Sequence, residues 1–169
     1  SQDEIRHPSI KYYSAPSRDE LAKKKIEFVW FGFFNNWIPQ ENFYYASKNY
    51  NFEVNPLGRS EGTYNKYASL DDATDPLHYY LAYVKFGIGR TTSDAAHEIR
   101  DGHITRDEGV QLVKKFDHEL PSKSMKITLD YLNITEEDLE QITSAFKDRN
   151  PHLWKKTNQD WILKHAVYK

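Results

Sequence analysis

The residues best suited to chemistry lie in one aperiodic loop and in a short basic stretch that follows it. The loop contains Gly58-Arg-Ser-Glu-Gly-Thr-Tyr64 and ends at Asp71 and Asp72, and the basic stretch is Lys85-Phe-Gly-Ile-Gly-Arg90. Arg, Glu, Tyr and Asp between glycines suit sugar hydroxyls and phosphates, because the backbone can approach closely and a guanidinium fork matches paired oxygens. The alternative interpretation is an ordinary solvated loop. The candidate substrate-binding residues are Arg59, Ser60, Glu61, Tyr64, Asp71, Asp72, Lys85 and Arg90.

No metal site or catalytic nucleophile is apparent from the spacing of the other reactive residues. The chain has no cysteine, and its seven histidines lack the paired helical spacing of zinc hydrolases. Residues 101–108 resemble the second half of a calcium-binding loop, but His97 and Ile99 would stand at its first two ligand positions and offer no hard oxygen. We expect a capped turn there, surface positions for His97 and Glu98, and no metal, and we name no catalytic residue.

Composition excludes several classes of partner. The net charge of −2 gives no electrostatic basis for binding nucleic acid or an anionic membrane. The longest apolar run, residues 28–34, is far shorter than the roughly 20 residues of a membrane helix. Residues 1–8 lack the apolar centre of a signal peptide and suggest a chain cut in mid-sequence. We expect a cytoplasmic protein.

Capping residues and hydrophobic spacing predict that the loop is held by short helices. Ser17 with Glu20 and Thr105 with Glu108 form capping boxes, each of which opens a helix. Pro39 opens a helix to about Tyr50. One further helix is predicted to begin at Asp75-Pro76 and to end at Gly87 or Gly89. Four more are predicted at residues 93–100, 105–116, 123–132 and 136–147, the last capped by Thr135.

Two segments are predicted to be β structure. Residues 26–34 are aromatic and β-branched, as in a strand buried on both faces, and residues 153–156 and 161–165 flank a turn as in a hairpin. The predicted fold class is therefore α+β and mainly α-helical, with one buried N-terminal strand and a C-terminal β-hairpin. Residues 1–70 form one predicted region, with the strand, a helix and the long loop, and residues 71–169 form a helical region with the hairpin.

Three stretches together resemble the C-terminal half of the N-acetyl sugar amidotransferases of lipopolysaccharide (O-antigen) biosynthesis. They are residues 58–64 with Leu70-Asp-Asp72, residues 78–90, and Glu98-Ile-Arg-Asp-Gly-His-Ile-Thr-Arg-Asp-Glu108. The resemblance covers about residues 26–165. It implies the C-terminal portion of a PP-loop (adenine nucleotide α-hydrolase-like) ATP pyrophosphatase. Such an enzyme activates a carbonyl oxygen with AMP so that ammonia can displace it, and it would convert the N-acetyl group of a UDP-linked sugar into an acetamidino group.

The resemblance also implies cofactors and partners. The full-length enzyme would use ATP and Mg²⁺ and would receive ammonia from a glutaminase partner, and no cofactor is expected to bind this chain tightly. Arg59, Lys85 and Arg90 would face phosphates, and Glu61, Asp71 and Asp72 would face hydroxyls or a metal ion.

The sequence departs from the family's pattern in one important respect. The family's Ser-Gly-Gly-x-Asp-Ser phosphate loop is absent, as are its N-terminal cysteine pairs, so we expect residues 1–70 to complete a nucleotide-binding domain and the chain to be inactive alone. Two alternatives stay open. One is a non-catalytic helical protein-interaction module, and the other is a small hydrolase whose acid and base come from Glu61, Asp71, Asp72 or a histidine.

Overall fold

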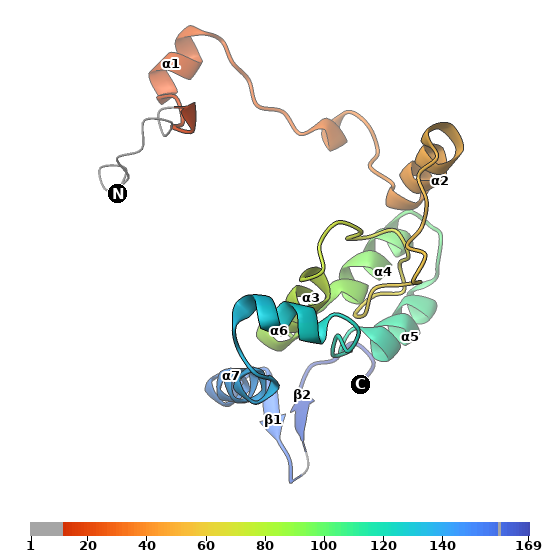
Figure 1. Ribbon diagram of the computed structural model, residues 1–169. Coiled ribbons are helices and arrows are strands. Elements are labelled where there is room, and N and C mark those ends of the chain that lie inside the picture. The colour runs from red at the N-terminus through yellow and green to blue at the C-terminus, as the bar shows by residue number, and fades with distance from the viewer. Residues whose placement is uncertain (1–11, 159) are drawn as a thin grey trace. The chain divides into compact units, whose positions relative to one another are not determined.

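The computed structural model describes residues 12–158 and 160–169, and the chain divides into two compact units, Ser1–Trp37 and Ile38–Lys169 (Figure 1). The division predicted from the sequence, into residues 1–70 and 71–169, concerns the domains of the full-length enzyme and stays a prediction. No helix in the part of the chain that is described has the length and apolar character needed to cross a membrane.

In the described part of the first unit, residues 12–37, α1 (Arg18–Lys23) is a short helix and η3 (Phe31–Phe33) is a 3-10 turn. The predicted capping box at α1 is confirmed. The Ser17 hydroxyl accepts a hydrogen bond of 3.2 Å from the Glu20 amide, and the Glu20 carboxylate accepts one of 2.9 Å from the Ser17 amide. These bonds satisfy amides that have no partner inside the helix, so the first turn is stabilised locally.

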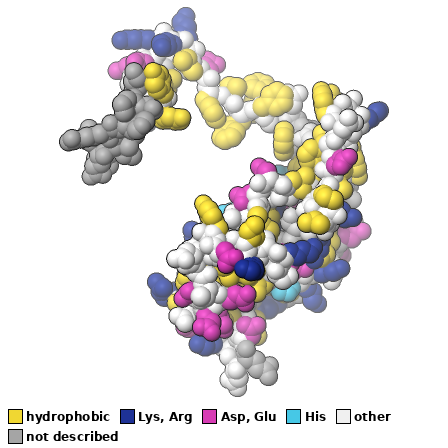
Figure 2. Space-filling view, in the orientation of Figure 1, with side chains coloured by type: hydrophobic (Ala, Val, Ile, Leu, Met, Phe, Trp, Pro, Cys, Tyr) yellow, Lys and Arg dark blue, Asp and Glu magenta, His cyan; other side chains and the backbone are white. Residues whose placement is uncertain are grey.

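The predicted buried strand over residues 26–34 is wrong. Residues 26–30 are unpaired, η3 follows them, and Phe28, Trp30 and Phe33 are 79%, 75% and 85% exposed. Figure 2 shows hydrophobic side chains along this segment at the surface. A strand needs a neighbour for its hydrogen bonds, and the only strands in the described residues pair with each other. The composition of residues 26–34 favours a strand, but the described residues provide no neighbouring strand for it to pair with.

The second unit is mainly helical, as predicted. The Thr105 and Thr135 hydroxyls each accept a hydrogen bond from the backbone amide three residues on, which confirms both predicted caps. The helix predicted from residue 93 begins earlier, at Arg90, because a buried carboxylate from elsewhere in the chain binds its first amides. The helices are α2 (Pro39–Tyr50), α3 (Asp75–Phe86), α4 (Arg90–Arg100), α5 (Arg106–Phe116), α6 (Met125–Leu132) and α7 (Glu136–Arg149).

The predicted C-terminal hairpin is also confirmed. Strands β1 (Trp154–Lys156) and β2 (Trp161–Leu163) pair in antiparallel register, with Trp154 opposite Leu163. The Trp154 indole is buried and donates a 2.9 Å hydrogen bond to the Val84 carbonyl, which fastens the hairpin to α3. A separate apolar cluster joins α3, α6 and α7 and consists of Leu77, Met125, Leu129 and Leu139.

Candidate functional site

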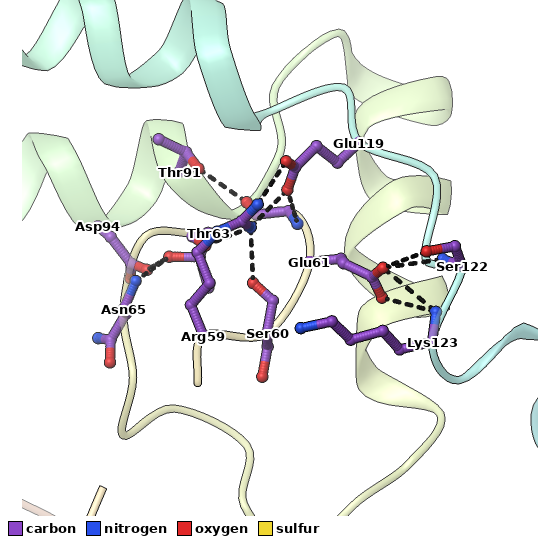
Figure 3. Close-up of polar contacts among 11 residues, drawn as sticks. Arg59, Ser60, Glu61, Thr63, Asn65, Thr91, Asp94, Glu119, Ser122 and Lys123 are labelled. Carbon is purple, nitrogen blue, oxygen red and sulfur yellow. Dashed lines mark hydrogen bonds and ion pairs between the residues drawn. The ribbon is translucent and has the colours of Figure 1, made fainter. Parts of the chain in front are cut away.

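Arg59, a predicted phosphate ligand, is bound by an internal carboxylate. Its guanidinium donates two hydrogen bonds to the Glu119 carboxylate, at 2.6 Å and 2.7 Å (Figure 3). The guanidinium also lies 4.4 Å from the centre of the Phe116 ring. Burial opposes ionisation of Glu119, but the hydrogen bonds from Arg59 and from the Gly62 amide outweigh it and lower the pKa of Glu119. The guanidinium fork therefore holds the loop against the chain that follows α5.

Glu61 has a similar supporting geometry. It is 8% exposed, and its carboxylate accepts hydrogen bonds from the Ser122 amide at 3.0 Å, the Ser122 hydroxyl at 2.7 Å and the Lys123 amide at 3.2 Å (Figure 3). Ser60 adds its carbonyl, which accepts a hydrogen bond from Arg59. The loop is thus tied both to the end of α5 and to the turn that leads into α6.

The start of α4 is occupied by Asp117, which the sequence analysis did not identify. Asp117 is 3% exposed and accepts hydrogen bonds from the Gly89 amide at 2.7 Å, the Thr92 amide at 2.9 Å and the Thr92 hydroxyl at 2.7 Å. Helix starts attract anions, and here an internal carboxylate takes that place. One signal was available, because an acidic residue directly after the C-terminal end of a helix is electrostatically unfavourable unless something else binds it.

The other predicted residues do not converge on one point. Asp72 accepts two 2.7 Å hydrogen bonds from Thr74 at the start of α3, whereas Lys85 is exposed near the end of α3, about 15 Å along the axis from Asp75 at 1.5 Å per residue. Arg90 contacts Asp94 at 2.8 Å and lies over the Tyr79 ring. Asp71 is exposed. Asp72 lines a pocket next to α6, and Tyr64 lines a different pocket, beside the loop.

This pocket, which we call the loop pocket, has a volume of about 200 Å³ and lies between α2, the loop and α4. Phe43 and Tyr67 form one wall and stack with their ring centres 4.5 Å apart and their planes 7° from parallel. A 3.1 Å hydrogen bond from the Tyr67 hydroxyl to the Gln40 side chain fixes that wall. Its lining includes Gln40, Phe43, Tyr64, Lys66, Tyr67 and Glu98.

Two polar groups lie next to each other in the loop pocket. The Tyr64 hydroxyl is buried and makes no hydrogen bond of good geometry to the described residues, and the acceptor within its reach is the Glu98 carboxylate. Burial and then the nearby Glu98 carboxylate raise the pKa of Tyr64, so the phenol stays neutral and can donate. Burial likewise raises the pKa of Glu98. The pocket therefore presents a neutral donor beside a partly buried acceptor, which is an arrangement suited to an uncharged polar ligand.

Comparison with known proteins agrees with the predicted family. Residues 61–168, nearly two thirds of the chain, match the family described as LPS biosynthesis protein WbpG-like, C-terminal domain. The chain belongs to this family. No curated protein matches it at a significant level. The matched region of this WbpG-like chain includes Tyr64 and Glu98, whereas Gln40 and Phe43 precede it.

The family assignment confirms the predicted link to lipopolysaccharide biosynthesis. The family's description names no reaction, so the amidotransferase activity and the PP-loop relationship remain predictions.

Proposed function

We propose that this chain forms the sugar-recognition part of an ATP-dependent N-acetyl sugar amidotransferase of lipopolysaccharide biosynthesis. The observation that supports the proposal is the loop pocket, where the Phe43–Tyr67 stack stands beside the buried Tyr64 hydroxyl and the Glu98 carboxylate. At about 30 Å³ per water molecule, the pocket has the space of six or seven waters, which suits a single sugar ring. Flat apolar walls with a few convergent polar groups are typical of such sites.

Each pocket residue has a role in this proposal. The Phe43–Tyr67 wall covers the apolar face of the sugar ring, the Tyr64 hydroxyl donates to a hydroxyl or carbonyl oxygen, and Glu98 accepts from an N–H or O–H group. The acetamido group of an N-acetyl sugar carries both the carbonyl and the N–H. Arg59, Ser60 and Glu61 act indirectly by holding the loop in place, and exposed Asp71 and Lys85 remain available for the rest of the substrate.

The described residues do not fit a nucleoside triphosphate. A phosphate cradle needs free backbone amides and free cationic forks. The amides at the start of α4 bind Asp117, and the Arg59 fork binds Glu119. We therefore place ATP and Mg²⁺ in another part of the full-length enzyme and derive no step through them. Ammonia would come from a glutaminase partner, and the absence of cysteine suits the cytoplasmic setting of this proposal.

The test is calorimetric titration of the chain with UDP-N-acetylglucosamine as the probe. UDP-glucose carries the same nucleotide without the acetamido group and isolates the contribution of that group. Removing one partner of a buried hydrogen bond costs about 1–3 kcal/mol, so Tyr64→Phe and Glu98→Gln should each weaken binding by roughly 5- to 100-fold.

The matched control for the binding test is Tyr50→Phe, because Tyr50 is the last residue of α2, is 72% exposed and does not line the pocket. It should leave affinity unchanged. Affinities of Tyr64→Phe and Glu98→Gln equal to that of the unsubstituted chain, in variants that melt no lower than that chain, would remove the sugar from the loop pocket.

A further inference from the structure

A second pocket, which we call the hairpin pocket, has no part in the proposed function. It has a volume of about 330 Å³ and lies between α3, α7 and the hairpin. Aromatic rings form much of its walls, and Lys147, Lys169, His118 and Asp160 also line it. The Lys169 ammonium is already bound by the Leu163 carbonyl. The residues that carry the argument are Tyr80, Lys147, Trp154, Asp160, Trp161 and Tyr168.

Lys147 is the unusual member of the hairpin pocket. It is half-buried, its ammonium lies 4.9 Å from the centre of the Trp154 ring, and among the described residues it has no salt bridge. Burial lowers the pKa of Lys147, and the charge of Asp160 only partly offsets that effect. A partly buried cation without a hydrogen-bonded carboxylate is costly, and an anionic ligand would remove much of the cost.

The walls of the hairpin pocket are fixed before any ligand binds. Trp154 is 3% exposed, is hydrogen-bonded to the Val84 carbonyl, and meets the Tyr83 ring edge to face at 5.5 Å. Trp161 lies on the paired strand β2 and stays partly exposed toward solvent. A partly exposed ring on a rigid support offers a stacking surface at little entropic cost.

We propose that the hairpin pocket binds a planar ring that carries a phosphate or a carboxylate. The ring lies against Trp161 and Tyr80, and the anionic group contacts Lys147. Asp160 acts electrostatically on Lys147 and repels an anion, so the ligand's charged group must approach Lys147 more closely than it approaches Asp160. Nucleotides and aromatic acids share this chemistry. The proposal uses neither Tyr64 nor Glu98, and it stands whether or not the loop pocket binds sugar.

The experiment titrates the full 169-residue chain with UMP, 4-hydroxybenzoate, uridine and inorganic phosphate and follows each by calorimetry. At least one of the two anionic rings should saturate the protein and bind about tenfold or more tightly than neutral uridine, because hydrogen bonds to charged groups are worth about 1.5–3 kcal/mol. The comparison of UMP with 4-hydroxybenzoate tells a nucleotide from an aromatic acid.

Substitutions locate the binding. Lys147→Gln should reduce the affinity for the anionic ring to that for uridine, whereas Lys147→Arg should retain most of it. Lys155→Gln is the matched control, because Lys155 is an exposed lysine next to Trp154 on β1 and points to the opposite face of the hairpin. It should change nothing. Tyr64→Phe and Glu98→Gln should also leave this binding intact, which separates it from the sugar proposal.

Three results would overturn the hairpin-pocket proposal. They are the absence of saturable binding for both anionic rings, inorganic phosphate binding as tightly as UMP, and unchanged binding in Lys147→Gln. Equal loss in Lys147→Gln and Lys147→Arg would also count against it, because the second variant keeps the charge.

Discussion

Replacement of Asp117 by alanine tests whether the start of α4 is closed by an internal carboxylate. The substitution removes three hydrogen bonds, leaves the Gly89 and Thr92 amides without a partner, and removes a negative charge from a helix start. Loss of a capping side chain costs about 0.5–2 kcal/mol, and a partly buried charge at a helix end is worth up to about 2 kcal/mol. We expect Asp117→Ala to lower the free energy of unfolding by about 2–4 kcal/mol.

Thermal and urea unfolding, followed by circular dichroism, measure this loss. For a chain of this size, the expected change corresponds to a fall in melting temperature of roughly 5–15 °C. Formate can replace the missing carboxylate and should stabilise Asp117→Ala more than the unsubstituted chain, when compared with chloride at the same ionic strength. Asp148→Ala, at an exposed acidic residue of α7, is the control and should change stability by less than about 0.5 kcal/mol.

The reasoning about α4 is refuted if Asp117→Ala unfolds like the unsubstituted chain. It is also refuted if phosphate raises the melting temperature of the unsubstituted chain as much as formate raises that of Asp117→Ala. The amides at the start of α4 would then be free to bind an added anion.

Three further predictions concern the loop, the hairpin and the loop pocket. Arg59 and Glu119 should show a coupling energy of about 1–3 kcal/mol in a double-mutant cycle, against less than about 0.5 kcal/mol for the exposed pair Lys126–Asp130. Equal coupling energies would contradict a stabilising, partly buried fork. Gly87→Ala and Gly102→Ala both place alanine at positive φ, at a cost of roughly 1–2 kcal/mol. Only the Cβ at position 87 would lie within 2.8 Å of the Leu163 side chain, so Gly87→Ala should lower the melting temperature more than Gly102→Ala does. Because burial raises the pKa of Glu98, ionisation of this carboxyl opposes folding, so Glu98→Gln should melt above the unsubstituted chain at neutral pH. The two melting temperatures should converge below about pH 4.3, where the glutamate is protonated in both states. A difference in melting temperature that stays constant across pH would contradict this.

The helices could be predicted because their signals are local. Thr105 and Thr135 lie within three residues of the amides they cap, and Pro39 lies at the first turn of the helix it opens. The start of α4 could not be predicted in this way, because its capping carboxylate comes from Asp117, 25 residues beyond Thr92. The prediction of a strand at residues 26–34 failed for a related reason. A strand requires a neighbouring strand, and composition does not reveal whether one is present.

For the candidate site, the kind of group that a side chain binds was predicted better than the identity of its partner. The fork of Arg59 does bind a pair of oxygens, but they belong to Glu119 and not to a phosphate. Tyr64 was selected from the loop and lines the loop pocket. Gln40 and Phe43 were not selected, because they come from a helix whose contact with the loop depends on tertiary packing. Glu98 was predicted to lie at the surface, and it is partly buried beside Tyr64.

The most direct test of the account is to map UDP-N-acetylglucosamine binding on the labelled chain by NMR. The account predicts that the largest shifts fall on Tyr64, Tyr67 and Glu98, and that UDP-glucose produces smaller shifts there. The signals of Arg59 and Glu61 should move little, because their side chains stay bound to Glu119 and Ser122. Shifts centred on Arg59 and the start of α4, with the loop-pocket signals unmoved, would contradict the account.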